Sequence, residues 1–180
     1  MASPEPLSPL APEAGARAAE TLDLGIDASL LASLGRVVVL WGYVEMLLAR
    51  LLAQFSGADA SAMITVSSEL PAETVAVSVA RLARQKLTAE TAVERVLTCL
   101  SDVDVLRREH DMLVHGRWDR GSTPGTATIL TPHPVRREVM QVVGVGAADL
   151  AAIEDHAHEV VHQLTALCLE VGVRFDGSLG

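Results

Sequence analysis

The sequence predicts an all-α protein, a four-helix up-and-down bundle with a short β-hairpin inserted before the last helix. Three observations lead to this fold class. Hydrophobic residues make up 49% of the chain but aromatic residues only 3%, so the core must consist of Leu, Val and Ala, which favours helices packed on helices. Long apolar runs carry helix-boundary residues at their ends. Only the stretch between residues 117 and 145 has β-favouring character.

The chain divides into a tail and one domain. Four prolines fall in residues 1–24 among Ala, Ser and Glu, a composition that buries too little apolar surface to offset the entropy of ordering the chain. We therefore expect a disordered tail over residues 1–24. Residues 25–180 have the length of a single helical domain.

The first predicted helix begins after Asp27, a good N-cap, and runs to about Phe55 with apolar residues nearly all round its middle. We interpret it as a central, buried helix. A membrane span is the competing interpretation, but Glu45 and Arg50 would each cost about 2.5–3.5 kcal/mol near the bilayer centre. We therefore expect no membrane partner.

The elements that follow are shorter. Gly57 and Asp59 interrupt the first helix, and a short element is expected over residues 61–70. Pro71 starts a predicted helix over residues 72–87. Thr88 is expected to cap the next helix, residues 89–115, which ends before a glycine.

The last part of the chain combines strands and a helix. The runs TATIL and VMQVV, separated by PHP and preceded by STPG, predict a hairpin or two-strand flap over residues 117–145. Gly146 then leads into a last helix over residues 147–172. This helix or the first one offers an apolar surface through which we expect a homodimer.

Composition also bears on location and partners. Cys99 and Cys168 lie in apolar helical stretches, where a small buried thiol is the usual state, so no disulfide is expected and a reducing, cytoplasmic compartment is predicted. No secretory signal pattern opens the chain.

The net charge of −9 weighs against nucleic-acid binding by bulk electrostatics. The segment from Arg107 to Arg137 nevertheless holds six arginines and three acids, so it is locally positive.

A polar cluster, RREHDMLVHGRW, closes the 89–115 helix. On a helical wheel His110 falls on the apolar stripe, whereas Arg108, Asp111 and His115 follow one another on a different, polar face. Arg108 and His115 are about 10 Å apart along the axis, so both long side chains could reach one phosphate.

These residues resemble the signature of the HEPN superfamily, in which a helix ends in Arg, four to six residues and then His. The string HDMLVHG is similar to the common RNxxxHG form, with Asp111, His115 and Gly116 at matching positions. The position five before His115, usually Arg, is His110, and Arg108 restores the looser six-residue spacing. The segment WGYVEMLL on the first helix and a tryptophan after HG also resemble uncharacterised bacterial members.

The resemblance implies a small all-α protein, a metal-independent endoribonuclease of the toxin or phage-defence kind. His115 would transfer a proton at the ribose 2′-hydroxyl and Arg108 would stabilise the transition state, roles that suit imidazole and guanidinium. Asp111 would orient the histidine, with His110 in the place of the usual arginine. The resemblance further implies RNA as substrate, a homodimer and an antitoxin or other protein partner, and no cofactor or metal. Arg107 and Arg117 are candidates for holding the substrate, and Glu45, if buried, needs a partner such as Arg108, His115, Arg50 or solvent.

Structural interpretations stand beside this one. Positive groups at a helix C-terminus favour the helix dipole by roughly 0.3–1 kcal/mol, and Asp111 with His115 would make an ordinary surface pair. His110 alone fits a hydrogen-bonded core histidine. A non-catalytic helical module that binds a partner protein or nucleotide is therefore the alternative function.

A second motif is HEVVH at residues 158–162, which matches the H-E-x-x-H zinc-binding helix. A zinc hydrolase is a remote alternative, because only Cys168 and Glu170 follow as third ligands. His156 lies about 160° round the helix from His158 and faces elsewhere.

Overall fold

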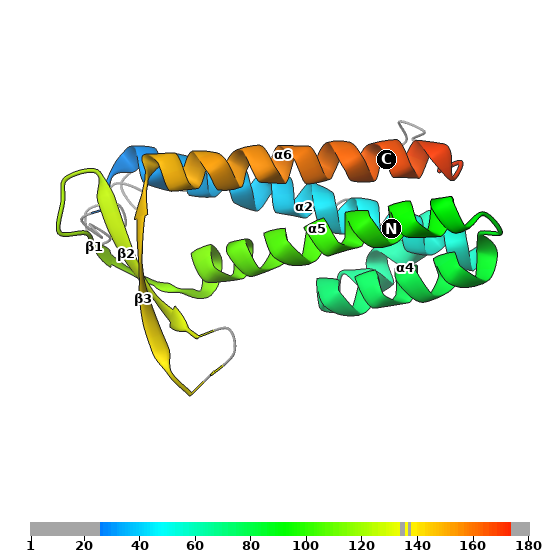
Figure 1. Ribbon diagram of the computed structural model, residues 1–180, viewed down its shortest axis with the longest axis horizontal. Coiled ribbons are helices and arrows are strands. Elements are labelled where there is room, and N and C mark those ends of the chain that lie inside the picture. The colour runs from blue at the N-terminus through cyan, green and yellow to red at the C-terminus, as the bar shows by residue number, and fades with distance from the viewer. Residues whose placement is uncertain (1–25, 134–135, 137, 174–180) are drawn as a thin grey trace, which may run out of the picture.

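The computed structural model describes residues 26–133, 136 and 138–173. The described chain is mostly helical with a small antiparallel sheet at one end (Figure 1). The predicted tail over residues 1–24 lies outside the described residues. The elements are the helices α2 (Ala28–Ser56), α3 (Ala60–Ser67), α4 (Ala72–Lys86), α5 (Glu90–His115) and α6 (Ala147–Glu170), and the strands β1 (Arg117–Arg120), β2 (Thr126–Pro132) and β3 (Met140–Gly146).

Helix α2 is the central element, since it packs against each of the other four described helices, most extensively against α6. Its ends are those that the sequence predicts. The Asp27 carboxylate accepts a hydrogen bond of 2.8 Å from the Ser29 backbone N–H, and Gly57 ends the helix at φ 75°, where glycine is favoured.

Among the described helices, α2 is also the one that is long and apolar enough to cross a membrane. The core helix of a soluble protein can be equally long and apolar. The fully buried residues Val37, Val44, Leu48 and Leu51 lie on its packed sides, whereas Val39 is 61% exposed. Length and composition alone therefore do not assign α2 to a membrane.

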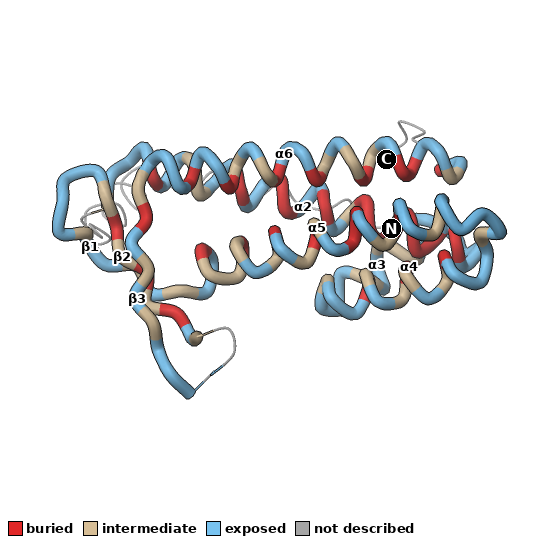
Figure 2. Tube along the Cα trace, viewed as in Figure 1, coloured by how far each residue is buried: buried red, intermediate tan, exposed pale blue. Residues whose placement is uncertain are grey.

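The core is aliphatic, as the composition predicts. Buried positions follow the facing sides of α2, α5 and α6, while much of the sheet is exposed (Figure 2). Cys99 and Cys168 are buried free thiols, and burial raises the pKa of each to about 12. The prediction of buried thiols without a disulfide is confirmed.

Helix α4 begins directly after Pro71, as predicted. The prediction that Thr88 caps the following helix is wrong. The chain is still extended at Leu87 and at Ala89, which occupies the N-cap position of α5, and no side chain caps the first turn. The threonine therefore lies one residue too early to reach the free amides of that turn.

The sheet has three strands in the order β1-β2-β3, all antiparallel. The predicted hairpin corresponds to β2 and β3, and the sequence prediction missed β1. Its residues, RWDR, carry no run of β-favouring residues, and they form a strand because they pair with β2. Since α5 leads into β1 and β3 leads into α6, the sheet joins the ends of these two antiparallel helices.

Candidate active site at the end of helix α5

The predicted site residues lie on the last turns of α5, where the helix meets the sheet. Gly116 ends the helix in an ordinary backbone conformation, with its N–H donating to the Met112 carbonyl oxygen. A Cβ atom at Gly116 would overlap that oxygen and the Ile129 side chain of β2. Glycine is therefore required here for the close approach of the chain to β2.

The two arginines of the cluster share one carboxylate. Arg107 Nη2 and Arg108 Nη2 each lie 2.9 Å from an oxygen of Asp104, and Arg107 Nη1 also lies 2.9 Å from Asp111 Oδ2. Partial burial works against the charge of Arg107, but Asp104 and then Asp111 outweigh it and raise the pKa of this guanidinium. The Arg108 side chain is 58% exposed and that of Arg107 only 24%.

The two histidines have different environments. His110 is buried and stacks on Trp41 of α2, with ring centroids 4.8 Å apart and planes inclined by 19°. Burial lowers the pKa of His110, an effect partly offset by Asp111 and Glu45. His115 is exposed and meets the His110 ring edge-on, with centroids 6.5 Å apart.

Asp111 does not contact the histidine that the sequence analysis assigned to it. Its carboxylate lies 2.9 Å from Arg107 and 3.5 Å from Nδ1 of His110. Within the described residues, neither Asp111 nor Arg108 makes a polar contact with His115. The structure thus groups Arg107, Asp111 and His110, and leaves Arg108 and His115 exposed on the same helix.

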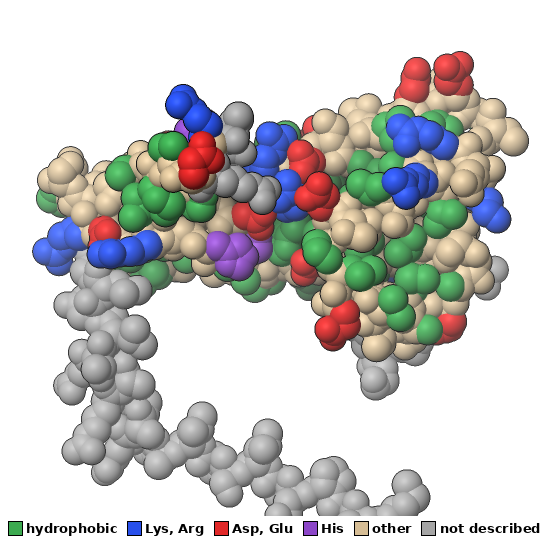
Figure 3. All heavy atoms as spheres, turned by 90° about the horizontal axis from the view of Figure 1, so that it is seen from below, with side chains coloured by type: hydrophobic (Ala, Val, Ile, Leu, Met, Phe, Trp, Pro, Cys, Tyr) green, Lys and Arg blue, Asp and Glu red, His purple; other side chains and the backbone are tan. Residues whose placement is uncertain are grey.

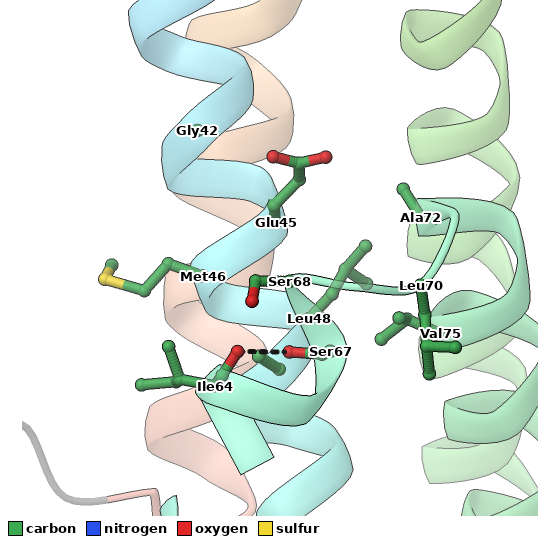
Figure 4. A pocket seen from close by; sticks show the side chains of 11 residues that line it. Gly42, Glu45, Met46, Leu48, Ile64, Ser67, Ser68, Leu70, Ala72 and Val75 are labelled. Atoms are coloured by element: carbon green, nitrogen blue, oxygen red, sulfur yellow. Dashed lines mark hydrogen bonds between the residues drawn. The ribbon is translucent and has the colours of Figure 1, made fainter. Parts of the chain in front are cut away.

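Glu45 does not need the buried partner that the sequence analysis considered, because its side chain is exposed. It lies at a cavity of about 240 Å³ between α2, α3 and the start of α4 (Figure 4). Met46, Leu48, Leu70 and Val75 contribute apolar walls. The Glu45 side chain is therefore open to solvent, one of the partners considered above, and its negative charge raises the pKa of His110.

The residues after the helix have separate roles. Arg117 on β1 is exposed, with its guanidinium 3.5 Å from Asp119. Trp118 is partly buried and its indole N–H donates a 2.6 Å hydrogen bond to the Leu113 carbonyl oxygen. This bond satisfies one of the four carbonyls that a helix end leaves free.

On the face seen from below, basic, acidic and histidine side chains gather between the sheet end and the wider helical end (Figure 3). The surface there is of mixed charge, not purely basic. A nucleic-acid strand on this face would therefore meet carboxylates as well as arginines.

The HEVVH motif forms no compact site. His158 and His162 are exposed on α6, and Glu159 interacts with Gln163. His156 instead lies 2.8 Å from Glu109 of α5 and links the two helices. Over the described part of the chain, no three His, Cys, Asp or Glu side chains come together to hold a metal ion.

Sequence reasoning missed two contacts, the Trp41–His110 stack and the Trp118 hydrogen bond. Both tryptophans were visible in the sequence, but their partners depend on how α2 and β1 lie against α5. Comparison with family models, curated proteins and solved structures finds no significant match to this chain.

Proposed function

We propose that the chain is a HEPN-like endoribonuclease that cleaves RNA without a metal ion. The observation that supports this proposal is the exposure of His115 and Arg108 on the last two turns of α5, beside the Arg107–Asp111 pair. The proposal includes the finer fold, an up-and-down bundle of four long helices. A cytoplasmic location, a homodimer and an antitoxin or other partner protein also belong to it.

The reaction is the one that the resemblance implies, and the side chains suit it. The ribose 2′-oxygen attacks the adjacent phosphorus and the bond to the 5′-oxygen breaks, which gives a 2′,3′-cyclic phosphate and a 5′-oxygen that takes a proton from water to become a hydroxyl group. His115 accepts the 2′-hydroxyl proton, since a neutral imidazole is a suitable base near pH 7. Arg108 exchanges the Asp104 carboxylate for the phosphate oxygens and stabilises their charge in the transition state.

The remaining residues hold this pair in place or bind RNA. Arg107 is fixed between Asp104 and Asp111, and Asp111 in turn lies beside His110. His110, packed on Trp41, supports the His115 ring from one side. Arg117 on β1 lies just after the helix and would hold the substrate backbone.

The experiment is an RNA cleavage assay with the full chain in excess chelator. Cleavage should persist in chelator, and His115→Ala should lower its rate by about 10²-fold or more, the usual contribution of a general base. Arg108→Ala should have a comparable effect. His158→Ala and Arg95→Ala are matched controls, since both residues are exposed and Arg95 pairs with Glu170 at the other end of α5. Cleavage that chelator abolishes, or that survives both site substitutions, would contradict the proposal.

A second candidate is a non-catalytic helical module that binds a protein partner or nucleotide. The salt bridges favour it, because Asp104 and Asp111 already engage both guanidinium groups. Among the residues that the structure describes, no hydrogen bond or ion pair joins His115 to an acid. An intact, folded protein that leaves RNA uncut would support this module over the endoribonuclease.

A further inference from the structure

Strand β3 forms an open edge of the sheet. In the strand order β1-β2-β3 it pairs with β2 on one side, and no described strand pairs with its other side. This edge is seven residues long, from Met140 to Gly146. Alternate residues along it therefore present N–H and C=O groups that another strand could pair with.

The opposite edge of the sheet is protected, whereas this one is not. Strand β1 has four residues and carries Arg117, Asp119 and Arg120. Strand β3 reads MQVVGVG and has neither a charged residue nor a proline, two of the devices that keep edge strands from associating. Its outward-facing side chains are apolar, with Met140 51% exposed and Val142 68% exposed.

The side-chain pattern of β3 fits a second copy of the same strand. A two-fold axis perpendicular to the sheet places the same face of both copies on the same side of the joined sheet. Residues on the exposed face of one β3 strand therefore lie opposite residues on the exposed face of the other. With Val142 opposite its counterpart, Met140 lies opposite Gly144 of the other copy. An added Cβ at Gly144 would meet nothing within 4 Å, so there is room for the methionine.

Charge is consistent with this pairing. Because β3 carries no charged residue, the antiparallel pair brings no like charges together along its length. The sheet of each copy continues into the other, and two three-stranded sheets become one of six strands. Val142, Met140 and the partly exposed Leu130, which pairs with Val142 in β2, then share an apolar surface.

We propose that two copies of this chain associate through their β3 strands, edge to edge and antiparallel. This interface is distinct from the α2 or α6 surfaces that the sequence suggested for a homodimer. It does not depend on the proposed ribonuclease activity.

The first test is the oligomeric state of the full chain by analytical ultracentrifugation. The wild type should be dimeric at micromolar concentration, and Val142→Lys should raise the dimer dissociation constant by about tenfold or more, since it places two like charges opposite each other. Val39→Lys is the matched control, because Val39 is 61% exposed on α2 and should leave the dimer unchanged. A monomeric wild type, or a dimer broken by Val39→Lys and not by Val142→Lys, would overturn the proposal.

The second test reports the register. Val142→Cys should form a disulfide-linked dimer under mild oxidation, because directly opposite residues in an antiparallel pair have Cα atoms about 4.5–5.5 Å apart, within the range of about 4.4–6.8 Å that a disulfide spans. Leu169→Cys, a similarly exposed position on α6 at 61%, should not form one. The native thiols are buried and do not compete. Cross-linking of Leu169→Cys alone would place the interface on α6 and exclude β3.

Discussion

His110 is the residue that connects the candidate site to the core. Its ring stacks on the Trp41 indole and makes a T-shaped contact with the His115 ring. An aromatic pair of this geometry contributes about 0.5–1.5 kcal/mol beyond the area it buries. Through this contact, the packing of His110 on Trp41 in the core helps to position His115.

Replacement of His110 should separate packing from charge. His110→Ala should lower the free energy of unfolding by about 2–3 kcal/mol, because it leaves a cavity against Trp41. His110→Phe should lower it much less, because a ring still covers the indole. Urea denaturation monitored by tryptophan fluorescence measures both, and equal losses for the two variants would contradict a packing role.

The pH dependence of the free energy of unfolding tests the effect of burying the His110 imidazole. Burial lowers the pKa of His110 in the fold, so below about pH 6.5 the unfolded chain binds a proton that the folded one does not. The free energy of unfolding should thus be highest above pH 6.5 and fall as the pH drops toward 5. His110→Phe should show a smaller fall over this range, and an identical fall would show that other groups cause it.

At the level of single residues, the sequence predicted which side of a helix a residue faces better than which side chains it contacts. The helical wheel placed His110 toward the core, and it is buried. It could not show that Arg107, not His115, takes the Asp111 carboxylate, because guanidinium length and rotamer decide that contact. Whether Arg108 serves as the missing arginine of the resembling motif remains a prediction.

At the level of elements, helix boundaries set by a local contact or by a glycine conformation were predictable. Asp27 caps α2 and Gly57 ends it, both through contacts within a few residues. Strand β1 was missed because only its partner β2, which follows a turn, makes it a strand. The strand count of a sheet therefore depends on pairing that a linear pattern does not contain.

Gly116 offers a prediction at this scale, since it joins α5 to the sheet. Gly116→Ala should lower the free energy of unfolding by about 1–3 kcal/mol, because the added methyl group overlaps Ile129 and the Met112 carbonyl oxygen. Gly35→Ala is the matched control. A Cβ at Gly35 meets nothing within 4 Å, and alanine should stabilise α2 by up to about 1 kcal/mol. If both variants were stabilised, the close approach at Gly116 would be excluded.

At the level of the whole molecule, α2 holds the helices together, because α3, α4, α5 and α6 all pack on it. Its composition suggested both a central core helix and a membrane span, and the charges of Glu45 and Arg50 favoured the core helix. Which of its sides are buried depends on the neighbouring helices, which the sequence does not place. Leu48 and Val39, on opposite sides of α2, mark its buried side and its exposed side. Leu48 is fully buried and Val39 is 61% exposed.

Leu48→Ala should therefore lower the free energy of unfolding by about 2.7–5 kcal/mol, the range for a leucine removed from a close-packed core. Val39→Ala, on the same helix, should change it by less than about 0.5 kcal/mol, as expected for a surface position. Equilibrium denaturation of the full chain in aqueous buffer measures both. A small effect of Leu48→Ala with a large effect of Val39→Ala would reverse the buried and exposed sides of α2, and with them the arrangement of the helices around it.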